Sequence, residues 1–214
     1  MARRLAFKLG QINLLLTFLT LAIIITIWSV PLYRGVITWL HLPEQLQVPF
    51  NEIMRDYWAI LKYLHSPWQK VLEVRNFSLS SQGRFHFYEV RRLFLELYGV
   101  GGLSSIGTYF FWQHLKKRKQ LWILEGFFAK SLWAPLGIGL ILTISFEPIF
   151  IGFHHVLFNN DAWLFDPLTD SIILMLPEVY FMACFLWAMG LMELFLFWAW
   201  RLVKKSKIMH SWMH

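Results

Sequence analysis

Three histidines of this 214-residue chain have neighbours that suit acid–base chemistry. Glu89 follows His86 by three residues, which places both side chains on one face if the segment is helical. His154 and His155 are adjacent, and Asp161 follows them within the same short segment. A nearby carboxylate raises the basicity of an imidazole and fixes its tautomer. These residue types predict general acid–base catalysis by histidine.

Further polar residues near the adjacent histidines are candidates for supporting roles. Glu147 precedes Pro148 within an apolar run, where an ionisable group is costly, so it is either functional or a contact between helices. Aromatic side chains surround both histidine segments and would either wall a site or form an interfacial belt. The remaining supporting candidates are Asn160, Trp163 and Asp170.

The sequence lacks the short motifs of several other chemistries. It contains no H-E-x-x-H, no G-x-S-x-G, no phosphate-binding P-loop and no glycine-rich dinucleotide turn. The single cysteine, Cys184, falls within a predicted membrane helix, where the thiolate that a nucleophile needs is disfavoured. The three histidines also lack the short ligand spacing of a zinc site. We therefore expect neither a metal nor another cofactor.

The composition indicates an integral membrane protein. Apolar residues make up 57 % of the chain and charged residues only 15 %, against about 25 % charged in an average soluble domain. One cysteine excludes a disulfide scaffold. The net charge of +7 comes from basic residues at the ends of apolar runs. This placement is typical of membrane orientation signals and argues against a nucleic-acid partner.

We predict an all-α fold with four transmembrane helices in a single membrane domain, residues 1–214. The predicted spans cover about 11–30, 93–113, 132–154 and 174–203, since each run is long enough to cross a bilayer. Most basic residues lie before the first span, between the second and third, and after the fourth. Both termini are therefore predicted to be cytoplasmic, and residues 31–92 to form an extracellular cap between the first two spans.

The cap is expected to contain one or two amphipathic helices and a short extended piece. Apolar residues recur with helical period through Asn51–Leu64, and Ser80–Gly83 is predicted to form a turn. His86 lies just before the second span, and the adjacent histidines lie at the end of the third. The topology therefore brings imidazoles from two distant segments to one depth, at the outer face of the membrane.

Two blocks of sequence carry a resemblance to a known family. One is Ser80–Phe94, which reads SSQGRFHFYEVRRLF. The other is Phe153–Pro177, which begins FHHVLFNNDAWLFDP. Both resemble blocks of the lipoprotein intramolecular transacylase family, Lit, of Gram-positive bacteria. The order and spacing of the blocks agree with that family over nearly the whole chain, and the family has four helices with an extracellular cap.

The resemblance implies an acyl shift that needs no cofactor. The substrate would be a lipoprotein with a diacylglyceryl group on its N-terminal cysteine, and the sn-2 acyl chain would move to the α-amine to give the lyso form. The family uses two catalytic histidines. One matches His86, and the other matches His154 or His155, with the spacing F-H-x-x-x-F favouring His154.

The resemblance also suggests roles for individual side chains. His154 would accept the amine proton and His86 would protonate the leaving oxygen, or the two roles would be reversed. Glu89 and Asp161 are candidates to orient the histidines. The candidate oxyanion donors are Asn160, Trp163 and a backbone N–H.

On this interpretation the protein resides in the cell membrane with its active site on the outer face, and membrane lipid is an expected partner. The oligomeric state stays open. Two other functions remain from the residues alone. One is a non-catalytic membrane adaptor or lipid-binding protein with an aromatic outer cap. The other is an enzyme that moves acyl chains between two molecules.

Overall fold

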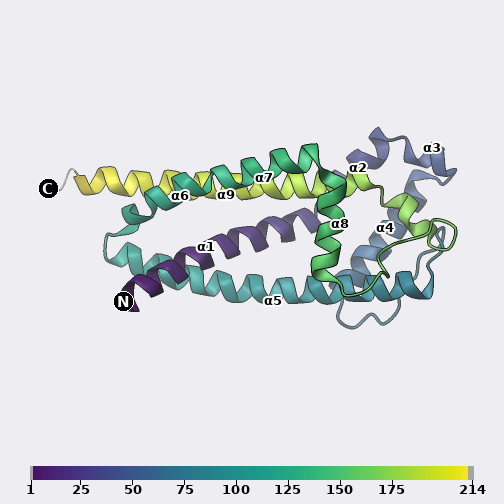
Figure 1. Ribbon diagram of the computed structural model, residues 1–214, viewed down its shortest axis with the longest axis horizontal. Coiled ribbons are helices and arrows are strands. Elements are labelled where there is room, and N and C mark those ends of the chain that lie inside the picture. The colour runs from purple at the N-terminus through teal and green to yellow at the C-terminus, as the bar shows by residue number, and fades with distance from the viewer. Residues whose placement is uncertain (1, 212–214) are drawn as a thin grey trace. The chain divides into compact units, whose positions relative to one another are not determined.

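The computed structural model describes residues 2–211, and these residues form helices and loops with no β-strand among them (Figure 1). The α-helices are α1 (Ala2–Ile27), α2 (Val30–Trp39), α3 (Leu42–Leu46), α4 (Phe50–His65), α5 (Ser81–Lys117), α6 (Glu125–Ser131), α7 (Trp133–Ile144), α8 (Phe146–Leu157) and α9 (Glu178–Ser211). Two short 3₁₀-helices are η1 (Leu121–Leu124) and η2 (Ser171–Met175).

Two compact units divide the chain. The first unit contains the described residues of 1–28, 98–144 and 185–214, and the second unit contains residues 29–97 and 145–184. Helices α5 and α9 contribute residues to both units. His86, His154 and His155 all belong to the second unit.

Polar and small residues join α1 to α5 within the first unit. The Asn13 side-chain amide donates to the Ser104 carbonyl at 2.8 Å and to the Thr108 hydroxyl at 2.9 Å. A Cβ at Gly10 would come within 2.4 Å of the Phe111 ring, so only glycine allows this approach. Close approach at small residues and hydrogen bonds between helices are typical of packing in membranes. Apolar side chains fill the rest of the core, which includes Leu14, Leu115, Leu124, Phe128, Leu196 and Val203.

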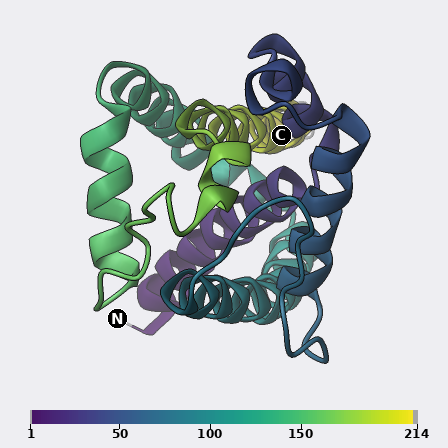
Figure 2. The same cartoon turned by 90° about the vertical axis from the view of Figure 1, so that its right-hand side faces the viewer.

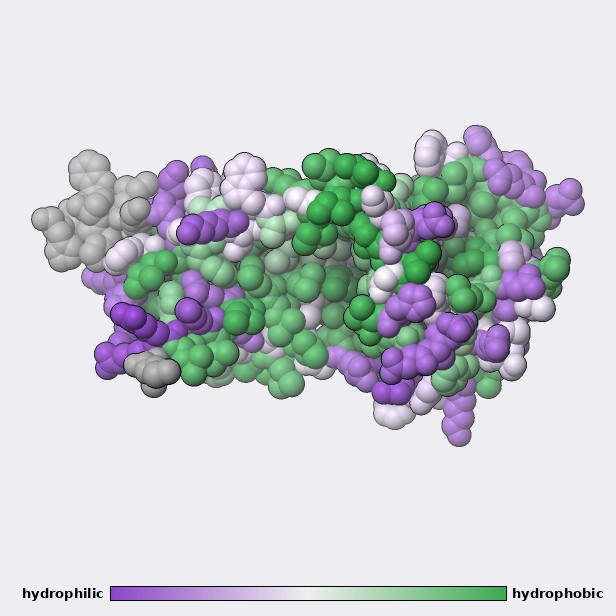
Figure 3. All heavy atoms as spheres, in the orientation of Figure 1, coloured by the Kyte–Doolittle hydropathy of each residue, from purple (hydrophilic) through white to green (hydrophobic). Residues whose placement is uncertain are grey.

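Three helical stretches are long and apolar enough to cross a membrane, Arg3–Ile27, Leu121–Ile144 and Glu178–Ser206. In the first unit, large apolar side chains such as Leu103 and Trp133 are about three-quarters exposed. Figure 3 shows apolar surface along the helices of this unit, with hydrophilic residues gathered where α1 begins and α5 ends. Helix α5 is not among the three, because Glu96 and several glycines and serines dilute its apolar residues. The fourth span therefore stays a prediction.

The third predicted span, 132–154, is not one continuous helix. Helix α7 ends at Ile144, Ser145 leaves the helical conformation with φ −139° and ψ 52°, and α8 begins at Phe146. The break places Pro148 in the first turn of α8. A backbone N–H in the first turn has no acceptor within the helix, so the missing N–H of proline costs no hydrogen bond there. The proline ring also has no preceding helical turn to clash with. The apolar stretch consequently stops before the adjacent histidines, which lie near the end of α8.

Helix α9 also begins later than the 174 predicted for the fourth span. Residues 171–175 form η2, and Leu176 has a non-helical backbone with φ −119° and ψ 65°. Because Pro177 disfavours the α conformation at the residue before it, the helix starts at Glu178.

The second unit has its own core, which is apolar with a tyrosine cluster. Tyr33 and Tyr57 stack with ring centroids 3.7 Å apart, and the Tyr57 and Tyr180 hydroxyls are hydrogen-bonded at 2.8 Å. The Tyr33 hydroxyl donates to the Met175 carbonyl at 2.8 Å. Figure 2 shows α4 and α8 on opposite sides of this unit, with the start of α5 and the segment after α8 between them. The core thus holds together α2, α4, the start of α5 and the segment that leads into α9.

The amphipathic helix predicted at Asn51–Leu64 is confirmed as α4, which runs from Phe50 to His65. The segment that follows it is tied down by Asp56, a fully buried carboxylate on α4. Asp56 accepts hydrogen bonds from the Arg75 and Asn76 backbone N–H groups at 3.0 and 2.9 Å. These bonds fix the loop between α4 and α5.

Candidate active site

The start of α5 is set by a cap and by a buried carboxylate. The Ser80 hydroxyl accepts the Gly83 N–H at 3.1 Å, which is an N-cap bond, and the Ser80 N–H donates to Asp170 at 2.7 Å. The turn predicted at Ser80–Gly83 is therefore wrong, because Ser81–Gly83 form the first turn of the helix. Asp170 is buried and also accepts the Thr169 hydroxyl at 2.9 Å. It anchors the helix that carries His86.

Glycine is required at position 83 by the closeness of this anchor. A Cβ at Gly83 would lie 2.3 Å from Asp170 Oδ1 and 2.7 Å from a Leu79 methyl group. Gly83→Ala is expected to displace Asp170, to cost about 1–3 kcal/mol of stability, and to reduce activity. The measurements are thermal unfolding in detergent and the rate of acyl transfer.

The matched control for that substitution is Gly99→Ala on the same helix, where a Cβ meets no described atom within 4 Å. This variant should keep wild-type stability and activity. Equal behaviour of the two variants would contradict a role for close packing at Gly83.

His86 and His154 lie side by side in the second unit. Each is 8 % exposed, and their ring centroids are 5.9 Å apart with an angle of 37° between the planes. Phe158 contacts both rings, with centroids 4.8 Å from His86 and 5.8 Å from His154. Phe165 packs edge-on against His86 at 5.6 Å. The structure thus pairs imidazoles from α5 and α8 within an aromatic enclosure.

Backbone contacts fix which nitrogen of His154 can act as a base. His154 Nδ1 lies 2.7 Å from the Phe150 carbonyl, one helical turn earlier. A carbonyl only accepts, so Nδ1 carries the hydrogen, and the lone pair of the neutral ring is on Nε2. The Trp163 indole stacks on His154 with centroids 4.7 Å apart and 27° between the planes. The ring is therefore held in one orientation from two sides.

Two nitrogens at this site are buried and have no hydrogen-bond partner in the described part of the chain. They are Nδ1 of His86 and Nε1 of Trp163. A buried polar atom without a partner is costly, and such atoms are concentrated where a ligand completes the bonding. One nitrogen belongs to the His86 ring and the other to the indole that stacks on His154, so both are available to hydrogen-bond a polar ligand.

Burial also keeps both imidazoles neutral. Desolvation and the neighbouring His154 lower the pKa of His86 to about 4. Desolvation lowers the pKa of His154 as well; the hydrogen bond to the Phe150 carbonyl opposes this shift, and the adjacent His155 adds to it. Both residues lie outside the three apolar stretches given above. At neutral pH both imidazoles are accordingly in the neutral form before the substrate binds.

Lowering the pH is expected to destabilise the wild-type protein more than a His86→Phe variant. His86 titrates near 6.5 in the unfolded chain and near 4 in the folded chain, so the unfolded state binds more protons between these values. The stabilisation from neutral His86 is complete above pH 6.5 and is lost as the pH falls towards 4. Thermal unfolding at about pH 7.5 and about pH 5 measures this difference. Parallel losses in the two proteins would contradict it.

A hydrogen bond between Glu89 and Asn160 joins α5 to the segment after α8. The Asn160 side-chain amide donates to Glu89 Oε1 at 2.9 Å, and Asn160 Oδ1 accepts the Ala162 N–H at 3.0 Å. Asn160 thus fixes both the carboxylate and the turn that leads to Trp163. Sequence reasoning named both residues but did not pair them.

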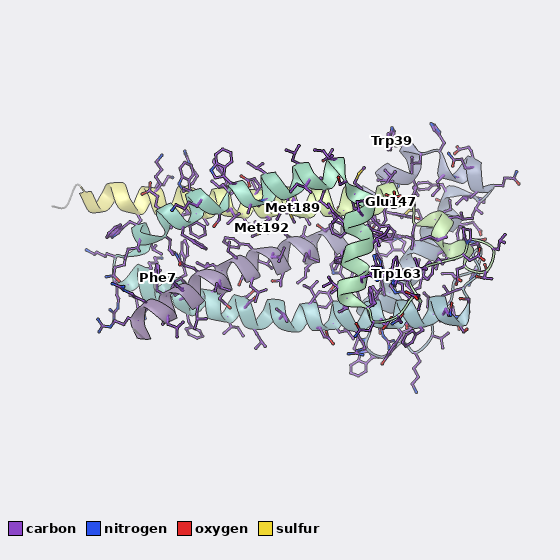
Figure 4. All side chains as sticks on the ribbon, in the orientation of Figure 1. Phe7, Trp39, Glu147, Trp163, Met189 and Met192 are labelled. Atoms are coloured by element: carbon purple, nitrogen blue, oxygen red, sulfur yellow. The ribbon has the colours of Figure 1, made fainter. Side chains whose placement is uncertain are left out.

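Three other candidates are exposed. His155 is exposed, and its ring is nearly perpendicular to that of Trp163, with centroids 5.2 Å apart. Asp161 is exposed. Glu147 is exposed in the first turn of α8, seven residues from His154 and so about 10 Å along the helix. Figure 4 shows Glu147 at one end of α8 and Trp163 towards the other.

The Phe150 carbonyl is the site group that sequence reasoning missed. Its signal was available, because a histidine on a helix can reach the carbonyl four residues earlier. Among the described residues no group of three or more His, Cys, Asp or Glu side chains is placed to hold a metal ion.

Comparisons with known proteins agree with the resemblance. The family model described as "Lipoprotein intramolecular transacylase Lit" matches residues 8–181. The structure is also similar to that of the membrane integral lipoprotein intramolecular transacylase Lit from Bacillus cereus, with a TM-score of 0.82, 29 % identity, and coverage of 96 % of this chain and 97 % of that one.

Two further structures are of Bacillus cereus Lit with one histidine replaced. The arginine variant has a TM-score of 0.79, 28 % identity, and coverage of 97 % and 94 % of the two chains. The alanine variant has a TM-score of 0.79, 28 % identity, and coverage of 96 % and 95 %. A search of curated proteins gives no match. The match to the family model covers well over half of the chain, so this membrane protein belongs to the Lit family of lipoprotein intramolecular transacylases and is an acyltransferase.

Proposed function

We propose that the protein moves the sn-2 acyl chain of a diacylglyceryl lipoprotein to the α-amine of its N-terminal cysteine, giving the lyso form. The observation that carries this proposal is the buried pair of His86 and His154, whose rings lie 5.9 Å apart. Conversion of an ester to an amide is exergonic and needs no energy source. The chemical task is to remove a proton from nitrogen and to deliver one to oxygen.

The two imidazoles would carry one proton from the amine to the leaving oxygen. The α-amine, with a pKa of about 8, must lose a proton to attack. His154 Nε2 is the base, since Nδ1 is bonded to the Phe150 carbonyl. The ammonium group loses one proton to water before the attack. As the C–N bond forms, the nitrogen gives a second proton to His154, which passes it to His86. The ester C–O bond breaks as His86 gives this proton to the glyceryl oxygen. The lowered pKa of His86 makes its protonated form a strong acid for this step.

Trp163 is the proposed oxyanion donor. The tetrahedral intermediate places negative charge on the former carbonyl oxygen, and a preorganised donor stabilises that charge. The Trp163 N–H is buried, has no partner among the described residues, and belongs to the ring stacked on His154. It is therefore the donor best placed to bind an oxygen held beside the base.

The proposed membrane topology keeps the predicted number and orientation of the spans, with the third ending at Ile144 and the fourth beginning at Glu178. We propose four spans, with residues 93–113 as the second, both termini in the cytoplasm, and residues 31–92 as an extracellular cap. Helix α8 then lies at the outer face, and the histidine pair meets lipoproteins in the outer leaflet of the cell membrane. The single membrane domain and the absence of a cofactor are parts of the same proposal.

Mass spectrometry of a reporter lipoprotein tests the function. The reporter is made in a strain that lacks N-acylation, with and without this protein. Because an intramolecular shift leaves the mass unchanged, fragmentation must locate the acyl chain. We expect fragments of N-acyl, S-monoacylglyceryl cysteine only when the protein is present. A diacylglyceryl cysteine with a free amine, in cells that contain the protein, would contradict the proposal.

An isotope experiment separates transfer within one molecule from transfer between two. Two reporters of different peptide sequence carry light and heavy acyl chains and are mixed with the purified protein. An intramolecular shift keeps each label on its own peptide. Heavy acyl groups on the light peptide would instead indicate an enzyme that acts between molecules.

A further inference from the structure

Glu89 offers a buried carboxylate oxygen that nothing in the described chain satisfies. Its Oε1 accepts the Asn160 amide at 2.9 Å, whereas Oε2 is buried and accepts no hydrogen bond. No ion pair involves Glu89 in the part of the chain that the structure describes. A buried carboxylate oxygen without a donor or a cation is costly, so this atom suits a ligand that supplies both.

The position of Glu89 places this oxygen beside the histidine pair. Glu89 follows His86 by three residues on α5, and neighbours at that spacing have Cβ atoms about 5–6 Å apart. Its partner Asn160 lies between Phe158, which contacts both imidazoles, and Trp163, which stacks on His154. The Glu89–Asn160 bond therefore joins the two segments that carry the catalytic pair, next to the reacting groups.

The arginines near Glu89 on α5 are engaged elsewhere. Arg84 donates to the Leu72 carbonyl at 2.9 Å. Arg91 donates to the Gln69 carbonyl and lies over the Tyr63 ring, 4.8 Å from its centroid. Arg92 pairs with Glu96 at 3.5 Å. None of them neutralises Glu89, which leaves its charge for a cation from outside the chain.

We propose that Glu89 binds the α-ammonium group of the N-terminal cysteine of the substrate, an inference that rests on the proposed function. One N–H of the ammonium group is donated to Oε2, and a second is turned towards His154 Nε2. Asn160 holds the other carboxylate oxygen and so keeps Oε2 in place. The nitrogen becomes positive again as it attacks the ester, and the carboxylate stabilises that charge.

This contact explains selectivity for the substrate and release of the product. A free α-amine is cationic near neutral pH and is attracted to Glu89. The product carries a neutral amide at the same nitrogen and loses this attraction. Glu89 thus favours lipoproteins with an unmodified N-terminus over those that have already been acylated.

A cycle that changes both the protein and the ligand tests the proposal. The ligands are dialkylglyceryl lipopeptides, whose ether-linked chains cannot be transferred. One carries the α-amine of cysteine, and the other carries a hydroxyl group in its place. Glu89→Gln keeps an oxygen for the Asn160 amide but removes the charge. We expect the wild-type protein to prefer the amine ligand roughly tenfold or more, and Glu89→Gln to bind both ligands equally.

Glu96→Gln is the matched control, because Glu96 is an exposed glutamate on the same helix. It should retain the wild-type preference. A merely structural Glu89 would leave the preference unchanged in Glu89→Gln, and that result would overturn the proposal. Absence of a preference in the wild-type protein would also overturn it, even if the variant failed to fold.

The rate on a reactive diacylglyceryl lipopeptide separates failure of this inference from failure of the proposed function. A wild-type protein that transfers the acyl chain but lacks the ligand preference contradicts only the role of Glu89. A wild-type protein that transfers nothing contradicts the function itself.

Discussion

We expect His154→Ala and His86→Ala each to lower the rate of acyl transfer by roughly 10²–10⁴-fold, and His155→Ala to retain the wild-type rate. Proton transfer by a positioned imidazole contributes roughly 10²–10⁴-fold to a rate, and the proposed proton path requires both members of the pair. His155 is exposed and lies at the edge of Trp163. The measurement is the initial rate of lyso-lipopeptide formation by purified variants in detergent or lipid.

Two further variants complete this test: the first controls for loss of fold, and the second tests whether the two histidines act as a unit. His154→Phe keeps a ring between Trp163 and Phe158 but has no nitrogen, so it should fold and remain inactive. The double variant His86→Ala/His154→Ala should lose little more than either single variant, because residues that act as a unit are not additive. If His154→Ala were active and His155→Ala inactive, the proposed role of His154 as the base would belong to His155.

We expect Trp163→Phe to lower kcat by roughly 10²–10³-fold, the usual effect of removing one oxyanion donor. Phenylalanine keeps an aromatic ring against His154 and removes only the buried N–H, which has no other partner among the described residues. The donor acts on charge that develops in the transition state, so KM should change little. Steady-state kinetics on a diacylglyceryl lipopeptide gives both constants.

The control for the indole substitution is Trp58→Phe on α4, where the side chain is about half exposed. It should preserve both kcat and KM. If Trp163→Phe kept the wild-type kcat, the indole N–H would not be the oxyanion donor, and the Asn160 amide or a backbone N–H would take its place. A rise in KM without a fall in kcat would instead assign Trp163 to substrate binding.

The amino-acid sequence determined the class of protein and the residue types of the site. Long apolar runs with basic ends predict membrane helices, because backbone polar groups in lipid must be satisfied within the segment. The helical period of Asn51–Leu64 predicted α4 correctly. The blocks around His86 and His154 were sufficient to indicate the family, which the family match confirms.

Local sequence was less reliable where a proline or a distant residue decided the backbone. Residues 132–154 read as one apolar helix, but Pro148 requires a helix start nearby, and the chain breaks at Ser145. The serines and glycine at Ser80–Gly83 read as a turn, yet they begin α5 because Asp170, far along the chain, accepts the Ser80 N–H. A pattern within one segment holds no information on such a partner.

Only the tertiary structure chose among the candidates for the site. His154 and His155 are neighbours in sequence, but successive residues on a helix point about 100° apart, so α8 can turn only one of them towards His86. Glu147 is exposed in the first turn of α8, and a hydrogen bond joins Glu89 to Asn160 across 71 residues of sequence. These decisions depend on how α5, α8 and the segment after α8 pack against one another. Periodicity and composition describe each segment alone, whereas a catalytic pair is a property of the contact between segments.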